Sequence, residues 1–312
     1  INGTGSIVGG VAGLAGASID TGFDGFGGSG GRGISIEGNT TINFNGAGTI
    51  AGGASVGFGG VNGTGIALDA NDITLNITGA NGTIIGGGTG GLGTAIQVLG
   101  GQTGNTITNA AIVGSTSTGV AVLIADNTAA LNNTGILQSG DSSTVDIQED
   151  ATLTILNNSA GGIIRTDSGN AIIVSGLIST IRNASSGAGG IRAITGVAIR
   201  NNDSGKLDLI DNTDGLITSA NIDPNGGTVA LYEDVAGLTI IGGTIDNTGG
   251  GNVIYFGNDQ AGPINSSASL IATATTNAVF FQGASTFVNT GSITGRFTSA
   301  AIASAQTYTQ NT

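Results

Sequence analysis

Gly119-Val-Ala-Val-Leu-Ile-Ala-Asp126 is the stretch that decides the fold, because other parts of the chain repeat its pattern. A small residue is followed by apolar residues at the third and fifth positions after it, and by Asp, Asn or Gly at the seventh. Apolar side chains that alternate with period two are typical of a β-strand, and the residue at the seventh position is typical of a turn. The other clear copies are Gly93-Thr-Ala-Ile-Gln-Val-Leu-Gly100, Gly169-Asn-Ala-Ile-Ile-Val-Ser-Gly176, Gly251-Asn-Val-Ile-Tyr-Phe-Gly-Asn258 and Thr276-Asn-Ala-Val-Phe-Phe-Gln-Gly283.

Weaker copies extend this repeat over most of the chain. A second strand built around Asn follows in most copies, as in Leu131-Asn-Asn-Thr-Gly-Ile136. Because Asn and Gly tolerate left-handed backbone conformations, they can form a sharp corner between two short strands. No helical periodicity persists over ten residues, so we expect almost no helix. The third-position apolar residues recur at a mean interval of about 27 residues and are Ile36, Leu68, Ile96, Val122, Val145, Ile172, Ile194, Val229, Ile254, Val279 and Ile302.

A repeat of this length predicts a solenoid. Stacked coils bring equivalent residues into ladders about 4.8 Å apart, with Ile and Val inside and Asn at the corners. We therefore predict an all-β fold, a parallel β-helix of about 11–12 coils of roughly 25 residues that forms one domain over 1–312. A β-sandwich or an up-and-down barrel is the alternative. Residues 1–32 are expected to form a Gly-rich first coil, and 195–228 a longer loop insertion.

The composition narrows the functional classes. The chain contains no Cys and no His, which excludes disulfide frameworks, metal sites with those ligands and Ser-His-Asp catalysis. Its 7 basic and 20 acidic residues give a net charge of −13, which argues against binding to nucleic acid or to an anionic membrane surface. The apolar runs are too short to span a bilayer. An acidic, cysteine-free chain rich in Gly, Thr and Asn favours a protein secreted to a bacterial cell surface.

An Asn-Thr-Gly phrase recurs through the chain, in Asn133-Thr-Gly-Ile136, Asn247-Thr-Gly249 and Asn289-Thr-Gly-Ser-Ile293. This recurrence resembles the passenger domains of Gram-negative autotransporters and related filamentous surface adhesins. The resemblance implies a right-handed, three-sided β-helix that serves adhesion, aggregation or display and is not an enzyme. It also implies surface glycans, or the surface of a host or neighbouring cell, as partners, and no cofactor.

Acidic clusters need attention because polysaccharide lyases and glycoside hydrolases also use β-helices and act through carboxylates. The densest cluster consists of Asp203, Asp208, Asp211 and Asp214, with Lys206 among them. Spacings of five, three and three residues place these acids on both faces of a strand and in turns, which favours a solvated loop. The alternatives are a calcium site formed by Asp208, Asp211 and Asp214, and catalysis by the acids of 203–214.

Positive charge is concentrated in one part of the chain, at Arg165, Arg182, Arg192, Arg200 and Lys206. A repeat near 25 residues places Arg165 and Arg192 at equivalent positions of successive coils. These basic residues are expected either to pair with nearby carboxylates or to form a contact patch for an acidic partner, such as another copy of the chain. The candidates for such a patch are Arg165, Arg192, Arg200 and Lys206.

Both ends of a β-helix expose unpaired strand edges, which can pair with another chain. The uncharged apolar segment near the N-terminus contains Ile7, Val8, Val11 and Leu14, and the last repeat contains Ile302. We predict that these segments pair between copies of the chain. Such head-to-tail contacts would form a filament or a surface array.

Overall fold

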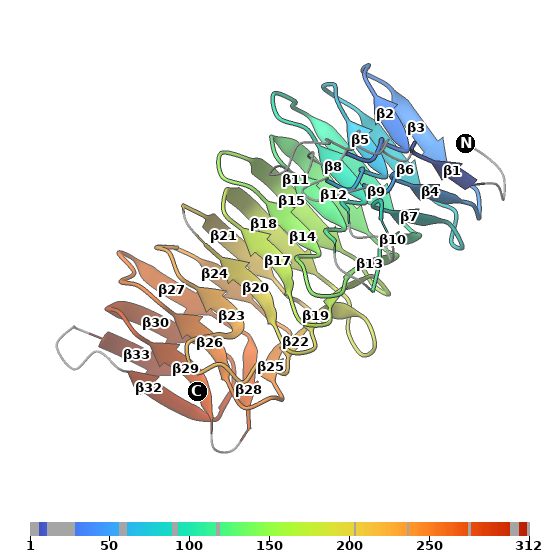
Figure 1. The fold of residues 1–312 in the computed structure, drawn as a ribbon. Helices are drawn as coiled ribbons and strands as arrows, with labels where there is room; N and C mark the ends of the chain where they lie inside the picture. Colours follow the sequence, from blue (N-terminus) through green and yellow to red (C-terminus); the bar gives the residue numbers. More distant parts are fainter. Residues whose placement is uncertain are drawn as a thin grey trace, which may run out of the picture.

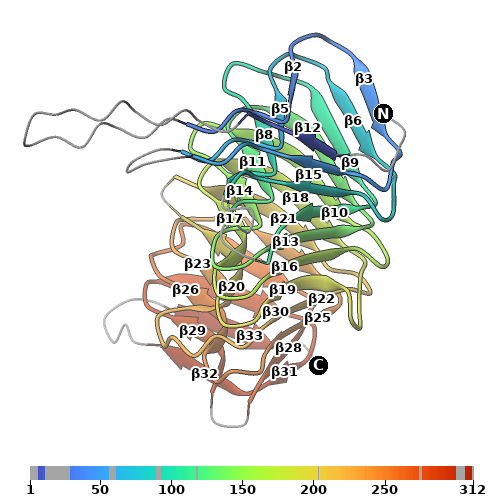
Figure 2. The same cartoon turned by 45° about the vertical axis from the view of Figure 1, so that its right-hand side comes forward.

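The computed structural model describes residues 6–10, 29–55, 61–88, 93–116, 119–202, 204–235, 237–273, 276–299 and 306–310. These residues form 33 short β-strands and contain no helix. The strands are arranged in three parallel sheets of eleven strands each, which we call sheets I, II and III. Successive coils stack from the blue N-terminal end to the red C-terminal end (Figures 1 and 2). The predicted parallel β-solenoid is therefore confirmed.

Each coil contributes one strand to each sheet, in the order I, II, III. Sheet I comprises β1 (Ser6–Val8), β4 (Thr49–Ala51), β7 (Thr83–Ile85), β10 (Ile112–Gly114), β13 (Ile136–Ser139), β16 (Ile163–Thr166), β19 (Gly190–Ala193), β22 (Leu216–Ser219), β25 (Thr244–Asn247), β28 (Ser269–Ala272) and β31 (Ile293–Thr294). Sheet II comprises β2 (Ile34–Ile36), β5 (Ile66–Leu68), β8 (Ile96–Val98), β11 (Val122–Ile124), β14 (Val145–Ile147), β17 (Asn170–Val174), β20 (Val197–Asn201), β23 (Gly227–Leu231), β26 (Asn252–Phe256), β29 (Asn277–Phe281) and β32 (Arg296–Ser299). Sheet III comprises β3 (Thr41–Phe44), β6 (Thr74–Ile77), β9 (Asn105–Asn109), β12 (Thr128–Asn133), β15 (Thr152–Asn158), β18 (Leu177–Asn183), β21 (Lys206–Asp211), β24 (Thr239–Ile241), β27 (Pro263–Ser266), β30 (Ser285–Asn289) and β33 (Gln306–Gln310).

The core is a set of inward columns that run through the stack. In sheet II one column joins equivalent residues of ten consecutive strands, and all of its members except the partly buried Ile34 are fully shielded from solvent. The column is Ile34, Ile66, Ile96, Val122, Val145, Ile172, Ile199, Val229, Ile254 and Val279. Burial of one branched aliphatic side chain per coil stabilises each coil against its neighbours, at about 1.5–3 kcal/mol for each side chain.

Three residues of the predicted series do not belong to this column of sheet II. Ile36 and Leu68 are buried on the predicted strands but two residues further along, in register with Val98. The predicted inward position of Ile194 was wrong. Ile194 follows the end of β19 and is 59% exposed, and Ile199 occupies the column in this coil. Ile199 was missed because Asn201, not an apolar residue, stands two positions after it. Ile302 lies outside the described residues.

The expected insertion at 195–228 is not one loop. This range contains β20, β21 and β22, so it completes a coil with a strand in each sheet. The long interval in the sequence series arose from the misplaced Ile194. With Ile199 in its place, the spacing to Val229 is 30 residues, within the scatter of the other coils.

A ladder of five buried Asn side chains runs along the corner between sheets III and I. Each amide donates to the side-chain oxygen of the next Asn, at Nδ2–Oδ1 distances of 2.9, 2.8, 2.9 and 2.7 Å. The amides also donate to backbone carbonyls at the corner, such as that of Gly162. All five side chains are fully buried, so the ladder satisfies polar groups that water cannot reach. We call Asn109, Asn133, Asn158, Asn183 and Asn212 the asparagine ladder.

The recurring Asn-Thr-Gly phrase occupies more than one kind of corner. Asn133-Thr-Gly135 and Asn289-Thr-Gly291 follow strands of sheet III and lead into sheet I. Asn247-Thr-Gly249 instead follows β25 and leads from sheet I to sheet II. There the Asn247 Oδ1 accepts hydrogen bonds from the Gly249 and Gly250 amides, which forms a tight turn.

Replacement of Asn158 by Ala is expected to lower the free energy of unfolding by about 3 kcal/mol, because it leaves buried groups of Asn133 and Asn183 without their ladder partner. Asn157→Ala is the matched control. Asn157 lies on the outer side of β15, next to Asn158, and its amide donates to the Asn132 side chain on β12, so its loss is expected to cost less than about 1 kcal/mol. Urea denaturation followed by circular dichroism measures both. Equal effects of the two substitutions would contradict a special role for the buried ladder.

Candidate functional site

The acids predicted as a calcium or catalytic site are not brought around one centre. Asp208 is exposed on the outer side of β21, and Asp214 is exposed in the following turn with φ of 60°. Asp211 lies 3.3 Å from the Arg182 guanidinium and accepts a 2.7 Å hydrogen bond from the Thr213 hydroxyl. Asp203 lies outside the described residues. Within the described ranges, no three His, Cys, Asp or Glu side chains are grouped so that they could hold a metal ion.

The environment of Asp211 is that of a structural ion pair. Burial acts to raise the pKa of this carboxyl, but the hydrogen bonds from Thr213 and Arg182 and the positive charge of Arg182 outweigh it and hold the pKa below its usual value. A carboxylate that is already hydrogen-bonded to its neighbours is poorly suited to proton transfer at neutral pH.

The basic residues lie on all three sheets, so the structure does not bring the four candidates for a contact patch onto one face. Arg165 and Arg192 are on sheet I, Arg200 is on sheet II, and Arg182 and Lys206 are on sheet III. Residues that are separated by only part of a coil lie on different sheets and face different sides of the solenoid. The predicted stacking of Arg165 on Arg192 is confirmed, because they are direct partners in the pairing of β16 with β19.

An aromatic cluster covers part of the outer face of sheet II. The Tyr255 ring lies 5.4 Å from Tyr232 and 5.7 Å from Phe280, and the Arg200 guanidinium carbon lies 4.7 Å from the centre of the Tyr232 ring. Tyr255 is only 2% exposed although it points away from the core. Sequence analysis missed this cluster, because alternation assigns Tyr255 to the solvent side.

The segment 221–226 packs over this cluster and is held by hydrogen bonds. The Tyr232 hydroxyl donates to the Asn225 carbonyl at 2.8 Å, and the Asn252 amide donates to the carbonyls of Pro224 and Gly226. Burial is the main reason why the pKa of both Tyr232 and Tyr255 is raised. The cluster is therefore a second, smaller packed region outside the solenoid core.

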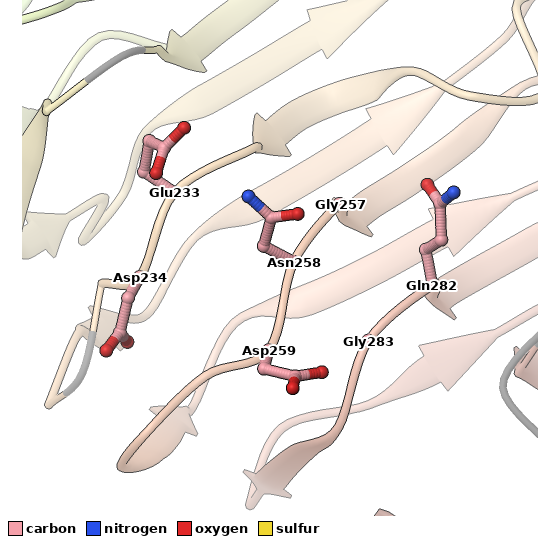
Figure 3. Close-up of a pocket in the computed structure, with 7 residues that line it drawn as sticks. All are labelled: Glu233, Asp234, Gly257, Asn258, Asp259, Gln282 and Gly283. Atoms are coloured by element: carbon pink, nitrogen blue, oxygen red, sulfur yellow. The ribbon is translucent and has the colours of Figure 1, made fainter. Parts of the chain in front are cut away.

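An acidic groove of about 540 Å³ crosses the turns that follow β23, β26 and β29 (Figure 3). Two of its carboxylates hold the stack together: Asp234 accepts a hydrogen bond from the Ala261 amide at 3.1 Å, and Asp259 accepts one from the Ala284 amide at 2.6 Å. Each bond joins one coil to the next, so these acids have a structural role. The lining residues are Glu233, Asp234, Gly257, Asn258, Asp259, Gln282 and Gly283.

A second groove of about 470 Å³ lies along the same side and contains a partly buried carboxyl, that of Asp146. In the outer column of sheet II, Asp146 stands between Leu123 and Ile173. Burial among these neighbours raises the pKa of Asp146, because desolvation penalises the charged form.

The predicted end-to-end contacts stay a prediction. Ile7 and Val8 lie in β1, the first strand of sheet I, and both are exposed there. Val11, Leu14 and Ile302 lie outside the described residues.

The fold and these surfaces define the chain as a β-solenoid with several polar outer faces. Comparison with protein-family models, with curated proteins and with solved structures gave no match. The resemblance to autotransporter passengers and filamentous adhesins therefore stays a prediction based on the Asn-Thr-Gly phrase. No helix capable of crossing a membrane occurs in the described part of the chain.

Asp146→Asn is expected to raise the unfolding midpoint at pH 7. The raised pKa means that the folded state binds the proton more tightly than the unfolded chain, so the charged carboxylate opposes folding above that pKa. This destabilisation decreases as the pH falls through the raised folded-state pKa towards the ordinary pKa of 3.8. The increase in unfolding midpoint that Asn gives is therefore smaller at low pH.

Thermal unfolding of both proteins between pH 7 and pH 3 tests this prediction. Asp208→Asn is the matched control, because it removes the same charge from an exposed position. If Asp146→Asn and Asp208→Asn raised the unfolding midpoint equally at every pH, the role of burial would be contradicted.

Proposed function

We propose that the chain is a non-enzymatic structural and adhesive rod of a bacterial cell surface. The observation that carries this proposal is the direction of its polar contacts. Outward-facing side chains bond to their equivalents in the neighbouring coil, as in the pairs Asn43–Asn76 and Asn132–Asn157. Polar chemistry is thus repeated from coil to coil on an outer face, as an extended contact surface requires.

Stiffness follows from the same arrangement. Eleven strands per sheet at a spacing of about 4.8 Å span about 48 Å between the first and last coil. Backbone hydrogen bonds and the buried ladder join the coils, so bending must distort several of them together. A stiff body with repeated outer faces can hold many weak contacts at once, which increases the overall strength of attachment.

The recurrent Asn-Thr-Gly corners support a bacterial surface role, because they are the feature shared with surface adhesins. A β-helical polysaccharide lyase or glycoside hydrolase that uses the acids of 203–214 was the alternative. Nothing in the environment of Asp208, Asp211 or Asp214 favours it, since Asp211 is paired with Arg182 and the other two are exposed.

Two measurements on the purified chain test the proposal. Beads coated with the protein are expected to be retained on polysaccharide-coated surfaces, while incubation with pectins, alginate and other acidic glycans is expected to release no new chain ends. Asp208→Asn and Asp211→Asn are the matched variants and should leave retention unchanged. Glycan cleavage that disappears in these variants would overturn the proposal, and so would the absence of retention on every surface.

A further inference from the structure

Strands β13, β16, β19, β22 and β25 are adjacent in sheet I (Figure 2). The outer face of these five strands carries a column of mostly polar residues. Its members are direct partners in the strand register. In every one of these strands the residues on either side of the column member are buried, so its side chain lies on the outer face. We call Gln138, Arg165, Arg192, Thr218 and Asp246 the arginine column.

The two arginines are held in place but keep donors for a ligand. The Arg165 Nε and Nη2 donate to the Gln138 side-chain oxygen at 3.3 and 2.7 Å. The Arg192 Nε donates to the Gly189 carbonyl at 2.7 Å, and its Nη2 donates to the Gly187 carbonyl. Each guanidinium has five N–H groups, so most of the ten are not used by these contacts. The two guanidinium groups are therefore positioned by the protein and remain able to bind an anion.

Neither arginine forms an ion pair among the described residues, although the Asp246 carboxylate, two strands away in the column, interacts with the charge of Arg192. In the part of the chain that the structure describes, the ion pairs join Arg32 to Asp69 and Arg182 to Asp211. Arg165 and Arg192 are direct partners on neighbouring strands, and their guanidinium groups bond to Gln138 and to the Gly187 and Gly189 carbonyls respectively. An oxyanion that contacts both side chains would accept charge-assisted hydrogen bonds from their remaining N–H groups.

An apolar column runs beside the arginine column, two residues earlier in each strand. Ile112, Ile136 and Ile163 are partners in register and are only partly buried, and Gly190 follows them next to Arg192. Gly190 has φ of +95°, and a Cβ there would lie 2.3 Å from the Leu216 carbonyl oxygen. Gly190 is buried and has no room for a side chain, so the isoleucine column ends at this strand.

These two columns define the ligand by its chemistry. The two cations suit one oxyanion, whereas the net charge of −13 and Asp246 at the end of the column disfavour a densely charged polyanion. The isoleucine column suits an apolar surface next to that oxyanion. A sugar acid has both features, since its ring presents C–H groups beside a carboxylate.

We propose that Arg165 and Arg192 bind the carboxylate of an acidic sugar unit within a largely neutral glycan, whose ring packs against Ile136 and Ile163. This inference rests on the proposed adhesive function and names the ligand class for one face of the rod. No bond is made or broken at this site.

Calorimetric titration of the full chain with a galacturonan oligosaccharide that is partly methyl-esterified tests the proposal. We expect each of Arg165→Gln and Arg192→Gln to weaken binding about tenfold, which corresponds to about 1.4 kcal/mol, because each variant loses one charged donor to the carboxylate. The double variant should show no binding. The fully methyl-esterified oligosaccharide, which lacks the carboxylate, should not bind to the unmodified protein. Arg182→Gln is the matched control and should bind normally, because Arg182 lies on sheet III.

Two further measurements separate the roles of charge, geometry and folding. Arg165→Lys combined with Arg192→Lys keeps the charge but loses the planar fork, so binding should fall although the unfolding midpoint is retained. Ile163→Ser removes an apolar contact and leaves both arginines in place, so it should weaken binding of the partly methyl-esterified oligosaccharide.

The outcomes distinguish this inference from the proposed function. Unchanged binding by the double Gln variant, or no binding of the carboxylated oligosaccharide by the unmodified chain, would overturn the ligand assignment. Binding of a short poly-glutamate peptide in preference to the oligosaccharide would overturn it in favour of a protein partner. In each of these cases, retention of protein-coated beads without glycan cleavage would leave the adhesive rod intact.

Discussion

The register between parallel coils is the constraint on which the rest of this structure depends. Each strand pairs with the equivalent strand one coil away, so any side chain is repeated against its counterpart about 4.8 Å away. Apolar residues gain from this repetition, because they pack in continuous columns. A buried polar residue is tolerated only when its counterpart can accept the hydrogen bond that it donates. Asn fulfils this condition because one side chain both donates and accepts.

This constraint explains why charged residues lie outside the stack and why they differ from coil to coil. A column of identical charges would accumulate repulsion, whereas the arginine column changes from Gln138 through two arginines to Thr218 and Asp246. Each Arg is oriented by an oxygen atom of a side chain or of the backbone. The outer faces can therefore vary in chemistry while the interior remains uniform.

The architecture could be predicted from the sequence because period-two alternation and the repeat are both local patterns. The interior polar residues could not be predicted in the same way. In Asn132-Asn133 and Asn157-Asn158 the second Asn is buried and the first faces outward, yet the two are identical in type. The same ambiguity misplaced one coil in the predicted series, because Asn201 is a buried Asn where other copies have an apolar residue. Polarity alone does not say which side of a strand faces the core.

The candidate sites were harder to predict than the fold. Sequence proximity grouped five basic residues, but the coil distributes them over three sheets, and only the spacing of about one repeat correctly joined Arg165 to Arg192. Tyr255 could not be assigned to a packed cluster, because the rings of Tyr232 and Phe280 that pack against it come from neighbouring coils. Packing on an outer face depends on which side chains the adjacent coils place there, and the repeat pattern does not specify them.

The outer aromatic cluster also gives the molecule an internal optical probe. The chain has three Tyr and no Trp, and two of the three, Tyr232 and Tyr255, lie with ring centres 5.4 Å apart. Most of the tyrosine emission and near-ultraviolet dichroism therefore originates from one side of sheet II. These signals report on the local order of the segment 221–226, whereas the far-ultraviolet signal reports on the whole solenoid. Loosening of this covering segment can be observed separately from the unfolding of the coils beneath it.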